Sequence, residues 1–227
     1  DLYYCGSINY AALTLRSGSE MYLQHLKRFI WLFSFSLLLS FSLLSSSNAS
    51  YLDDKLSEAK YDLAFKKYSN LFMPTVDWQI LKAQCFQESL FDETAVSHVG
   101  AQGICQFMPN TWREQAQKLG IMASPFNATL NIKVAASYMG QLRAGWTAPR
   151  PEWDRHSLAM ASYNAGFGNL LKAQQACHNP TLYNGIIYCL PCITGRHAEE
   201  TITYVHRIWT FYQRIRDESK WLSSFDF

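Results

Sequence analysis

Residues 84–111 read QCFQESLFDETAVSHVGAQGICQFMPNT, and this stretch decides the fold. Its first part has helical spacing, because Leu81, Cys85 and Glu88 are four and three residues apart and so lie on one face of a helix. Trp78, three residues before Leu81, extends the same apolar face. From residue 92 the helical spacing is lost and two glycines appear, which predicts a loop with a small β-hairpin.

Glu88 is a carboxyl group on an apolar face. Burial disfavours a carboxylate and raises its pKa, and the negative end of a helix dipole acts in the same direction. A carboxyl that keeps its proton near neutral pH can serve as a general acid. Spacing alone leaves two interpretations open: an acid of this kind, or a glutamate at a frayed helix end that bends out to solvent.

Composition excludes several functional classes. The chain has 227 residues, 48% of them hydrophobic, which is enough for one sizeable core. Its net charge is +2, from 20 basic and 18 acidic residues, and no dense run of Lys or Arg indicates a nucleic-acid partner. We find no glycine-rich phosphate loop and no HExxH metal motif, and we predict neither a cofactor nor a metal.

The N-terminal part has the pattern of a secretory signal. Lys27 and Arg28 precede an apolar run over residues 29–44, and small residues ending at Ala49 follow. The alternative is an uncleaved membrane anchor. Sixteen helical residues span about 24 Å, which is shorter than the ~30 Å hydrocarbon core. We therefore expect cleavage after Ala49 and export to the periplasm or cell wall, with the N-terminal anchor as the alternative.

The signal defines the expected domain boundaries. Residues 1–20 precede Met21, a plausible start, and are interpreted as a leader or translated upstream sequence. Residues 1–49 are thus expected to be leader plus signal peptide. Residues 50–227 are expected to form one domain.

Export makes disulfides plausible. Cys177 is expected to pair with Cys189 or Cys192, because all three fall in one loop-like stretch. The alternative is a zinc site that uses Cys189 and Cys192, a CxxC pair, with Cys177, His178 or His197. It lacks a second ligand pair at regular spacing, so we favour the disulfide.

Two further cysteines are interpreted differently. Cys85 and Cys105 each lie within an apolar run. Cysteine is among the residue types most often buried. We expect both to be buried thiols that do not form a bridge.

The pattern from residue 50 onward predicts helices almost throughout. An apolar stripe at spacings of four, three and four residues predicts a first helix carrying Leu52, Leu56, Ala59 and Leu63. Polar residues are predicted to cap the three helices that follow: Asp77, Asn110 and Asn127. A fifth helix is expected over 154–164, an irregular segment over 175–197, and a last helix over 198–221. The fold class is α+β, mainly α.

Three motifs in order resemble the soluble lytic transglycosylase family, the goose-lysozyme-like enzymes that cleave peptidoglycan. They are the segment from Glu88 to Thr111 with GAQGICQ, then ASYNAG at 161–166, then ETITYV at 200–205. The resemblance covers about residues 62–215. It implies a lysozyme-like helical domain of goose type with a small hairpin.

The resemblance also implies roles for residues early in the site. Glu88 takes the position of the single catalytic acid and base. Ser97 matches a serine beside the catalytic glutamate, and Gln106 matches the glutamine of the GLMQ motif in the substrate groove.

Later motifs supply the remaining candidates. Tyr163 and Asn164 match the YNAG pair that lines the cleft around the reacting sugar. Glu200 and Tyr204 match the glutamate and tyrosine that face the cleft from the last helix.

The implied reaction is non-hydrolytic. Glu88 would protonate the bond between N-acetylmuramic acid and N-acetylglucosamine, then take a proton from the muramic C6 hydroxyl, which closes onto C1. The product is a 1,6-anhydromuramoyl end. A hydrolytic lysozyme and a non-enzymatic wall-binding component of a secretion or conjugation apparatus are the alternatives. The expected partner is the peptidoglycan glycan strand, and the membrane is contacted only through the signal or anchor.

The chain departs from the family pattern at three places. Cys105 stands where an aliphatic residue or Met is usual, and His98 where a proline is usual. We interpret His98 as a loop residue. Residues 174–197 are longer and richer in cysteine than the usual connection, so the choice between exo and endo cleavage is open.

Overall fold

The computed structural model describes the backbone of residues 50–223 and the side chains of residues 50–217. The expected signal, with its apolar run at 29–44, lies outside these residues. The chain divides after Asp53, and the described residues from Asp54 onward form one compact unit. No helix in the described range is both long and apolar enough to span a membrane.

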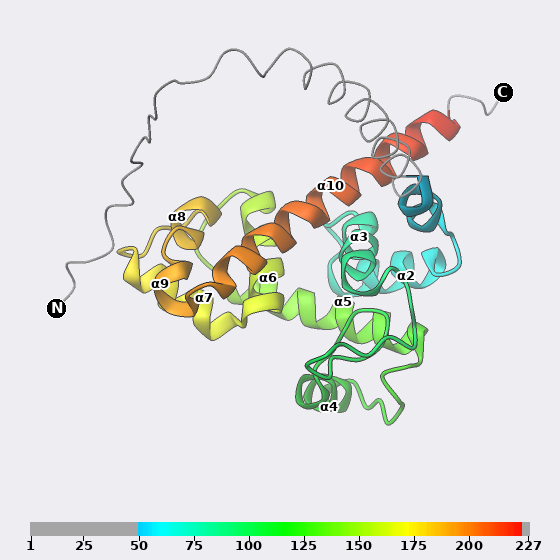
Figure 1. The fold of residues 1–227 in the computed structure, drawn as a ribbon, viewed down its shortest axis with the longest axis horizontal. Helices are drawn as coiled ribbons and strands as arrows, with labels where there is room; N and C mark the ends of the chain where they lie inside the picture. Colours follow the sequence, from blue (N-terminus) through cyan, green and yellow to red (C-terminus); the bar gives the residue numbers. More distant parts are fainter. Residues whose placement is uncertain (1–49, 224–227) are drawn as a thin grey trace, which may run out of the picture. The chain divides into compact units, whose positions relative to one another are not determined.

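Helices build most of this unit (Figure 1), and the sequence predicts a mainly helical fold. Residues 50–57 are helical. The elements that follow are α2 (Asp62–Phe72), α3 (Trp78–Ser89), α4 (Pro109–Lys118), α5 (Ala128–Gly145), α6 (Glu152–Ala165), α7 (Phe167–Ala176), α8 (Tyr183–Ile187), α9 (Leu190–Thr194) and α10 (His197–Ser223). The long helix α10 packs along α3 and α6, and α5 packs against α2 and α6. The end of α3 and the face of α10 therefore lie against each other.

Two of the three predicted helix caps are confirmed. The side chain of Asp77 accepts a hydrogen bond from the backbone N–H of Gln79, and that of Asn127 from the backbone N–H of Leu130. The predicted cap at Asn110 is wrong, because α4 already begins at Pro109. Proline suits the first helical position, where its missing N–H would have no partner within the helix.

The first predicted helix is interrupted. Residues 58–61 are not helical, and α2 starts anew at Asp62. The predicted stripe therefore breaks: Leu56 is 1% exposed, whereas Leu63 is 82% exposed. The break provides polar partners for the buried Lys82. Its ammonium group lies 2.8 Å from the Asp62 carboxylate and 3.0 Å from the Glu58 carbonyl oxygen. A buried ammonium requires such partners.

The small hairpin is confirmed as two isolated antiparallel bridges. Val96 pairs with Gln102, and Gln102 pairs with Phe107. Gly103 has a φ of 77°, and a Cβ atom there would collide with the carbonyl oxygen of Pro125. Only glycine fits this position, so the hairpin is held closely against the loop before α5.

The expectation for Cys85 and Cys105 is wrong, because the two form a disulfide. Both are fully buried, as expected of their apolar surroundings. The bridge joins α3 to the hairpin, and Ser89 adds a hydrogen bond from its hydroxyl to the Ile104 carbonyl oxygen at 2.8 Å. Neither apolar run reveals this contact, since it exists only once the hairpin folds back onto α3.

The segment expected to be irregular contains short helices. α7 begins directly after Gly166, and α8 and α9 lie within residues 175–197. A helix of five residues makes little more than one turn, which is too short to show an apolar stripe in sequence. Of the two pairings left open, the structure has Cys177 bonded to Cys189, which joins the end of α7 to the start of α9.

Replacing Cys85 and Cys105 together by alanine is expected to lower the free energy of unfolding by about 3 kcal/mol, because the bridge closes a loop in the unfolded chain. Urea denaturation of parent and variant under oxidising conditions measures this. The matched control is the parent with reductant, which should lose at least as much. Equal stability of the variant and the oxidised parent would show that the bridge contributes nothing.

Candidate active site

Glu88 lies in the last turn of α3, and its surroundings match the expected apolar face. Leu81 and Cys85 are buried at 1% and 0% exposure. Trp78 and Glu88 itself are partly buried. The helix ends at Leu90, whose left-handed backbone turns the chain away towards the hairpin. Glu88 is therefore held at the edge of the core and is not a frayed surface charge.

A cavity of about 420 Å³ opens beside the Glu88 carboxyl. α3 contributes two of its residues, the end of α6 contributes one, and α10 contributes the others. The lining residues are Gln87, Glu88, Asn164, Glu199, Glu200, Thr203, Tyr204 and Arg207. Three of the residues predicted from the motifs, Asn164, Glu200 and Tyr204, thus meet around Glu88.

Tyr204 makes the direct contact with Glu88. Its hydroxyl donates a hydrogen bond of 2.6 Å to Oε1 of the carboxyl group. Tyr204 is only 5% exposed, and its burial, with the nearby charge of Glu88, raises the pKa of its hydroxyl well above the usual value. The phenol therefore stays a neutral hydrogen-bond donor.

The pKa of Glu88 is raised from 4.5 to about 8. Desolvation by burial is the largest cause. The hydrogen bond from Tyr204 favours the ionised form and lowers the pKa, whereas the negative charge of Glu200 raises it further. Glu88 is consequently mostly protonated at neutral pH, as a general acid requires.

Asn164 is oriented by a residue that the motifs did not single out. Its Oδ1 accepts a hydrogen bond of 2.7 Å from the hydroxyl of Thr201, which is 1% exposed. This fixes the amide so that its N–H donors are left for an acceptor in the cavity. Thr201 directly follows Glu200 in the ETITYV motif. The motif therefore gave its position in the sequence, but not its role as a hydrogen-bond donor to Asn164.

Tyr163 serves the hairpin. Its hydroxyl donates a hydrogen bond of 2.7 Å to the Cys105 carbonyl oxygen. Its ring packs against Phe107 and Tyr138 at centroid distances of 5.6 and 5.5 Å. Burial, together with the charge of Glu88, keeps the pKa of its hydroxyl well above the usual range. A contact with the sugar stays a prediction for this residue.

Ser97 and Gln106 also act within the hairpin. The Ser97 hydroxyl accepts a hydrogen bond from the Ala101 backbone N–H at 3.0 Å. The Gln106 amide donates to the carbonyl oxygens of Ala95 and Gly103, at 3.2 and 2.8 Å. Neither side chain lines the cavity at Glu88. Their predicted roles beside the substrate stay predictions, and the contacts present are those that shape the hairpin.

A second hollow of about 400 Å³ continues the first. The two share Asn164 and Glu200, and the far wall comes from α9 and the start of α10. Its lining residues are Asn164, Ala165, Asn169, Ile193, Thr194, His197, Glu200 and Thr201. The segment with the Cys177–Cys189 disulfide thus borders the site. That disulfide also takes Cys189, which the zinc alternative requires, and Cys177, one of the residues that could complete the zinc site.

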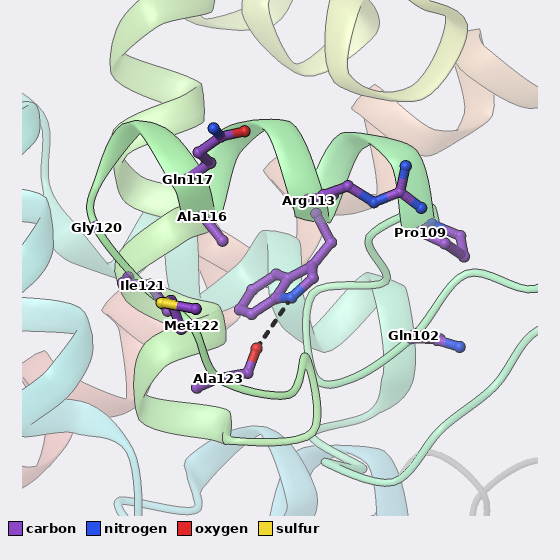
Figure 2. A pocket seen from close by; sticks show the side chains of 10 residues that line it. Gln102, Pro109, Arg113, Ala116, Gln117, Gly120, Ile121, Met122 and Ala123 are labelled. Atoms are coloured by element: carbon purple, nitrogen blue, oxygen red, sulfur yellow. Dashed lines mark hydrogen bonds between the residues drawn. The ribbon is translucent and has the colours of Figure 1, made fainter.

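The hollow beneath α4 is larger, about 640 Å³, but has a different character (Figure 2). Trp112 is one of its lining residues, and the indole N–H of Trp112 donates a hydrogen bond to the Ala123 carbonyl oxygen at 3.2 Å. No Asp or Glu is among its lining residues, and it shares none of them with the cavity at Glu88. It offers no acid for catalysis, so we place the candidate site at Glu88.

Four lining residues of the cavity were missed in the sequence: Gln87, Glu199, Thr203 and Arg207. The sequence pattern that places Thr203 and Arg207 at the cavity was present. Glu200, Thr203, Tyr204 and Arg207 follow one another at spacings of three, one and three residues, which define one face of α10.

The sequence profile of the family described as "Transglycosylase SLT domain" matches residues 67–182, half of the chain. The chain belongs to this family. The Glu88 cavity of this SLT domain is partly formed by α10, which lies beyond the matched residues.

Relatives and solved structures agree with this assignment. The domain is 29% identical over 157 residues to "Membrane-bound lytic murein transglycosylase F" of Desulfosudis oleivorans, covering 63% of the chain and 34% of the relative. It is 30% identical over 171 residues to the protein of that name from Idiomarina loihiensis, covering 69% and 36%. The chain therefore spans about a third of the length of these curated relatives.

Among solved structures, the fold is similar to that of the 70 kDa soluble lytic transglycosylase SLT70 of Escherichia coli. The TM-score is 0.60 at 20% identity, over 85% of this chain and 29% of that one. An inactive Glu-to-Gln mutant of the lytic transglycosylase Slt from Pseudomonas aeruginosa gives a TM-score of 0.57 at 24% identity, over 71% and 25%.

Changing Tyr204 to phenylalanine is expected to raise the pKa of Glu88 above about 8, because the lost hydrogen bond is the one that favours the ionised carboxyl. Carbon-13 NMR titration of the glutamate carboxyl groups measures this, with Glu88→Gln identifying the resonance. Tyr212→Phe is the matched control, since the Tyr212 hydroxyl bonds to Asp77 at the other end of α3. An unchanged or lowered pKa in the Tyr204 variant would contradict the assigned contact.

Proposed function

We propose that this SLT domain is an exported peptidoglycan lytic transglycosylase. It cleaves the β-1,4 bond between N-acetylmuramic acid and N-acetylglucosamine and leaves 1,6-anhydromuramoyl ends. The observation that carries the proposal is the partly buried, mostly protonated Glu88 at a cavity, hydrogen-bonded to Tyr204. Such a carboxyl can donate a proton and then accept one.

The names of the relatives support this activity. The curated relatives are called lytic murein transglycosylases. In the Pseudomonas aeruginosa protein, a mutant with glutamate changed to glutamine is described as inactive. These statements concern longer proteins, and we extend their activity to this chain as part of the proposal.

The first step is proton donation. Glu88 gives its proton to the glycosidic oxygen, the bond from that oxygen to C1 of the muramic sugar breaks, and N-acetylglucosamine leaves as an alcohol. The N-acetyl group of the muramic sugar supports the positive charge that develops at C1. The amide N–H donors of Asn164, left available by Thr201, fit the carbonyl oxygen of such a group.

The second step uses the ionised Glu88 as a base. It takes the proton of the C6 hydroxyl of the same muramic sugar, and that oxygen bonds to C1 and closes the anhydro ring. Glu88 is protonated again and no water is consumed. Between the steps, the hydrogen bond from Tyr204 stabilises the carboxylate.

Hydrolysis on the same fold would need a second carboxylate to activate water. The two acids that follow Glu88 in the sequence are used elsewhere. Asp92 accepts hydrogen bonds from Thr94, and Glu93 accepts one of 2.8 Å from the Tyr61 hydroxyl. Glu199 and Glu200 also line the cavity, but both are exposed, and the side chain of Glu200 is 70% exposed. These contacts support the non-hydrolytic reaction.

Export and partners depend on other parts of the chain. The signal over residues 29–44 stays a prediction, as does a partner in a secretion or conjugation apparatus. The murein glycan strand is the substrate that follows from the proposed activity.

Glu88→Gln is expected to reduce the release of soluble fragments from peptidoglycan by at least about 100-fold, because the amide can neither donate nor accept the proton. Mass spectrometry of fragments released by the parent should show ends lighter by one water than hydrolysed ends. Glu114→Gln, a change at an ion-paired surface residue on α4, is the matched control and should leave the rate unchanged. A Glu88 variant as fast as the parent excludes the mechanism, and hydrated ends would indicate a lysozyme.

Activity should fall as the pH rises through about 8. The protonated form of Glu88 is the donor, and it is populated below its folded-state pKa and lost above it. Initial rates on purified peptidoglycan across pH measure this, with circular dichroism at each pH confirming that the protein stays folded. A rate that keeps climbing well above pH 8 would count against Glu88 as the acid.

A further inference from the structure

Arg207 is a cation in the cavity of the candidate active site. It lies on α10 one turn after Tyr204, so both side chains project from the same face towards the cavity that Glu88 lines. Arg207 is exposed to solvent and is not needed to fill the core. The question is therefore which chemical group the guanidinium binds in the cavity.

No side chain within the described part of the chain forms an ion pair with Arg207. Three acids line the same cavity: Glu88, Glu199 and Glu200. Glu88 is mostly protonated and bonded to Tyr204. Oε2 of Glu200 lies 3.9 Å from Nδ1 of His197. Glu199 is exposed, and it too forms no ion pair with Arg207 among the described residues. The guanidinium thus faces the cavity without a carboxylate of its own.

An arginine fork is suited to bind a carboxylate through two parallel hydrogen bonds. The sugars of an intact glycan strand carry hydroxyl and N-acetyl groups, which are uncharged, and the lactyl carboxyl of the muramic sugar is uncharged because it forms the amide bond to the peptide. The carboxylates of peptidoglycan lie on the peptide that is attached to the lactyl group of the muramic sugar. Since Glu88 acts at that same sugar, this peptide leaves the strand only a few bonds from the reacting carbon.

We propose that Arg207 binds a carboxylate of this stem peptide and makes the enzyme prefer peptide-bearing glycan strands to strands without peptides. The inference rests on the proposed function and adds a determinant of substrate choice to it. Arg207 is a binding residue in this role and takes no part in proton transfer.

Kinetics on two substrates test the proposal. One is intact peptidoglycan strands, and the other is the same strands stripped of peptides by an amidase, with the lactyl carboxyl groups that the amidase frees converted to amides. Arg207→Gln is expected to lower kcat/KM on peptide-bearing strands by about tenfold, mainly through KM, and to leave stripped strands nearly unchanged. Arg207→Lys keeps the charge and should recover part of the preference. Arg113→Gln is the control, because it also removes an exposed arginine but lies at the hollow beneath α4.

Calorimetry separates this proposal from the proposed function, since it requires no turnover. A disaccharide-peptide is titrated into Glu88→Gln, with and without Arg207→Gln, and the titration is repeated with the peptide carboxylates amidated. The expected result is weaker binding when either Arg207 or the carboxylates are removed, and no additional loss when both are. If the parent cleaves neither substrate, the proposed function fails, and these titrations still decide the role of Arg207.

Three results would overturn the inference. Equal losses of kcat/KM on both kinds of strand would mean that Arg207 binds the sugar or supports the fold. Unchanged kinetics on both would mean that it contacts no substrate. Equal affinity for free-acid and amidated peptides would exclude a carboxylate as its ligand.

Discussion

The hydrogen bond from Tyr204 to Glu88 joins two residues that are 116 positions apart, and the candidate site depends on it. Burial alone would hold the carboxyl so strongly protonated that it could give up its proton only with difficulty. One donor offsets part of this penalty and leaves the pKa near 8. Because the donor belongs to α10 and the acceptor to α3, the acid acquires its properties only when the last helix docks on the core.

A second junction, between α3 and the hairpin, fixes the other side of Glu88. The Cys85–Cys105 disulfide and the hydrogen bond from Ser89 hold the hairpin to the same helix that carries the acid. Tyr163 then binds the Cys105 carbonyl oxygen from α6. The hairpin residues that a resemblance assigns to the substrate groove are, in this protein, bonded to the hairpin backbone itself.

Much of this could be predicted from the sequence, and the failures share a physical cause. The spacing of α3, the caps at Asp77 and Asn127 and the position of Glu88 follow from local rules. The features that were missed depend on contacts between distant segments, which no local pattern records. They are the disulfide at Cys85, the helix break beside Lys82 and the hydrogen bond that Thr201 donates. The short helices α8 and α9 were not predicted, because a single helical turn shows no periodic pattern of apolar residues.

The two disulfides have a consequence for where the protein can mature. Disulfides form and persist in oxidising compartments, whereas cysteine thiols stay reduced in a reducing cytosol. In a molecule whose thiols remain reduced, only hydrogen bonds and packing would hold the hairpin to α3. The covalent link between the end of α7 and the start of α9 would also be missing. The helix that carries Glu88 is therefore tied covalently to the hairpin only where the surroundings are oxidising, so the redox state of a compartment helps to decide how firmly this part of the fold is held.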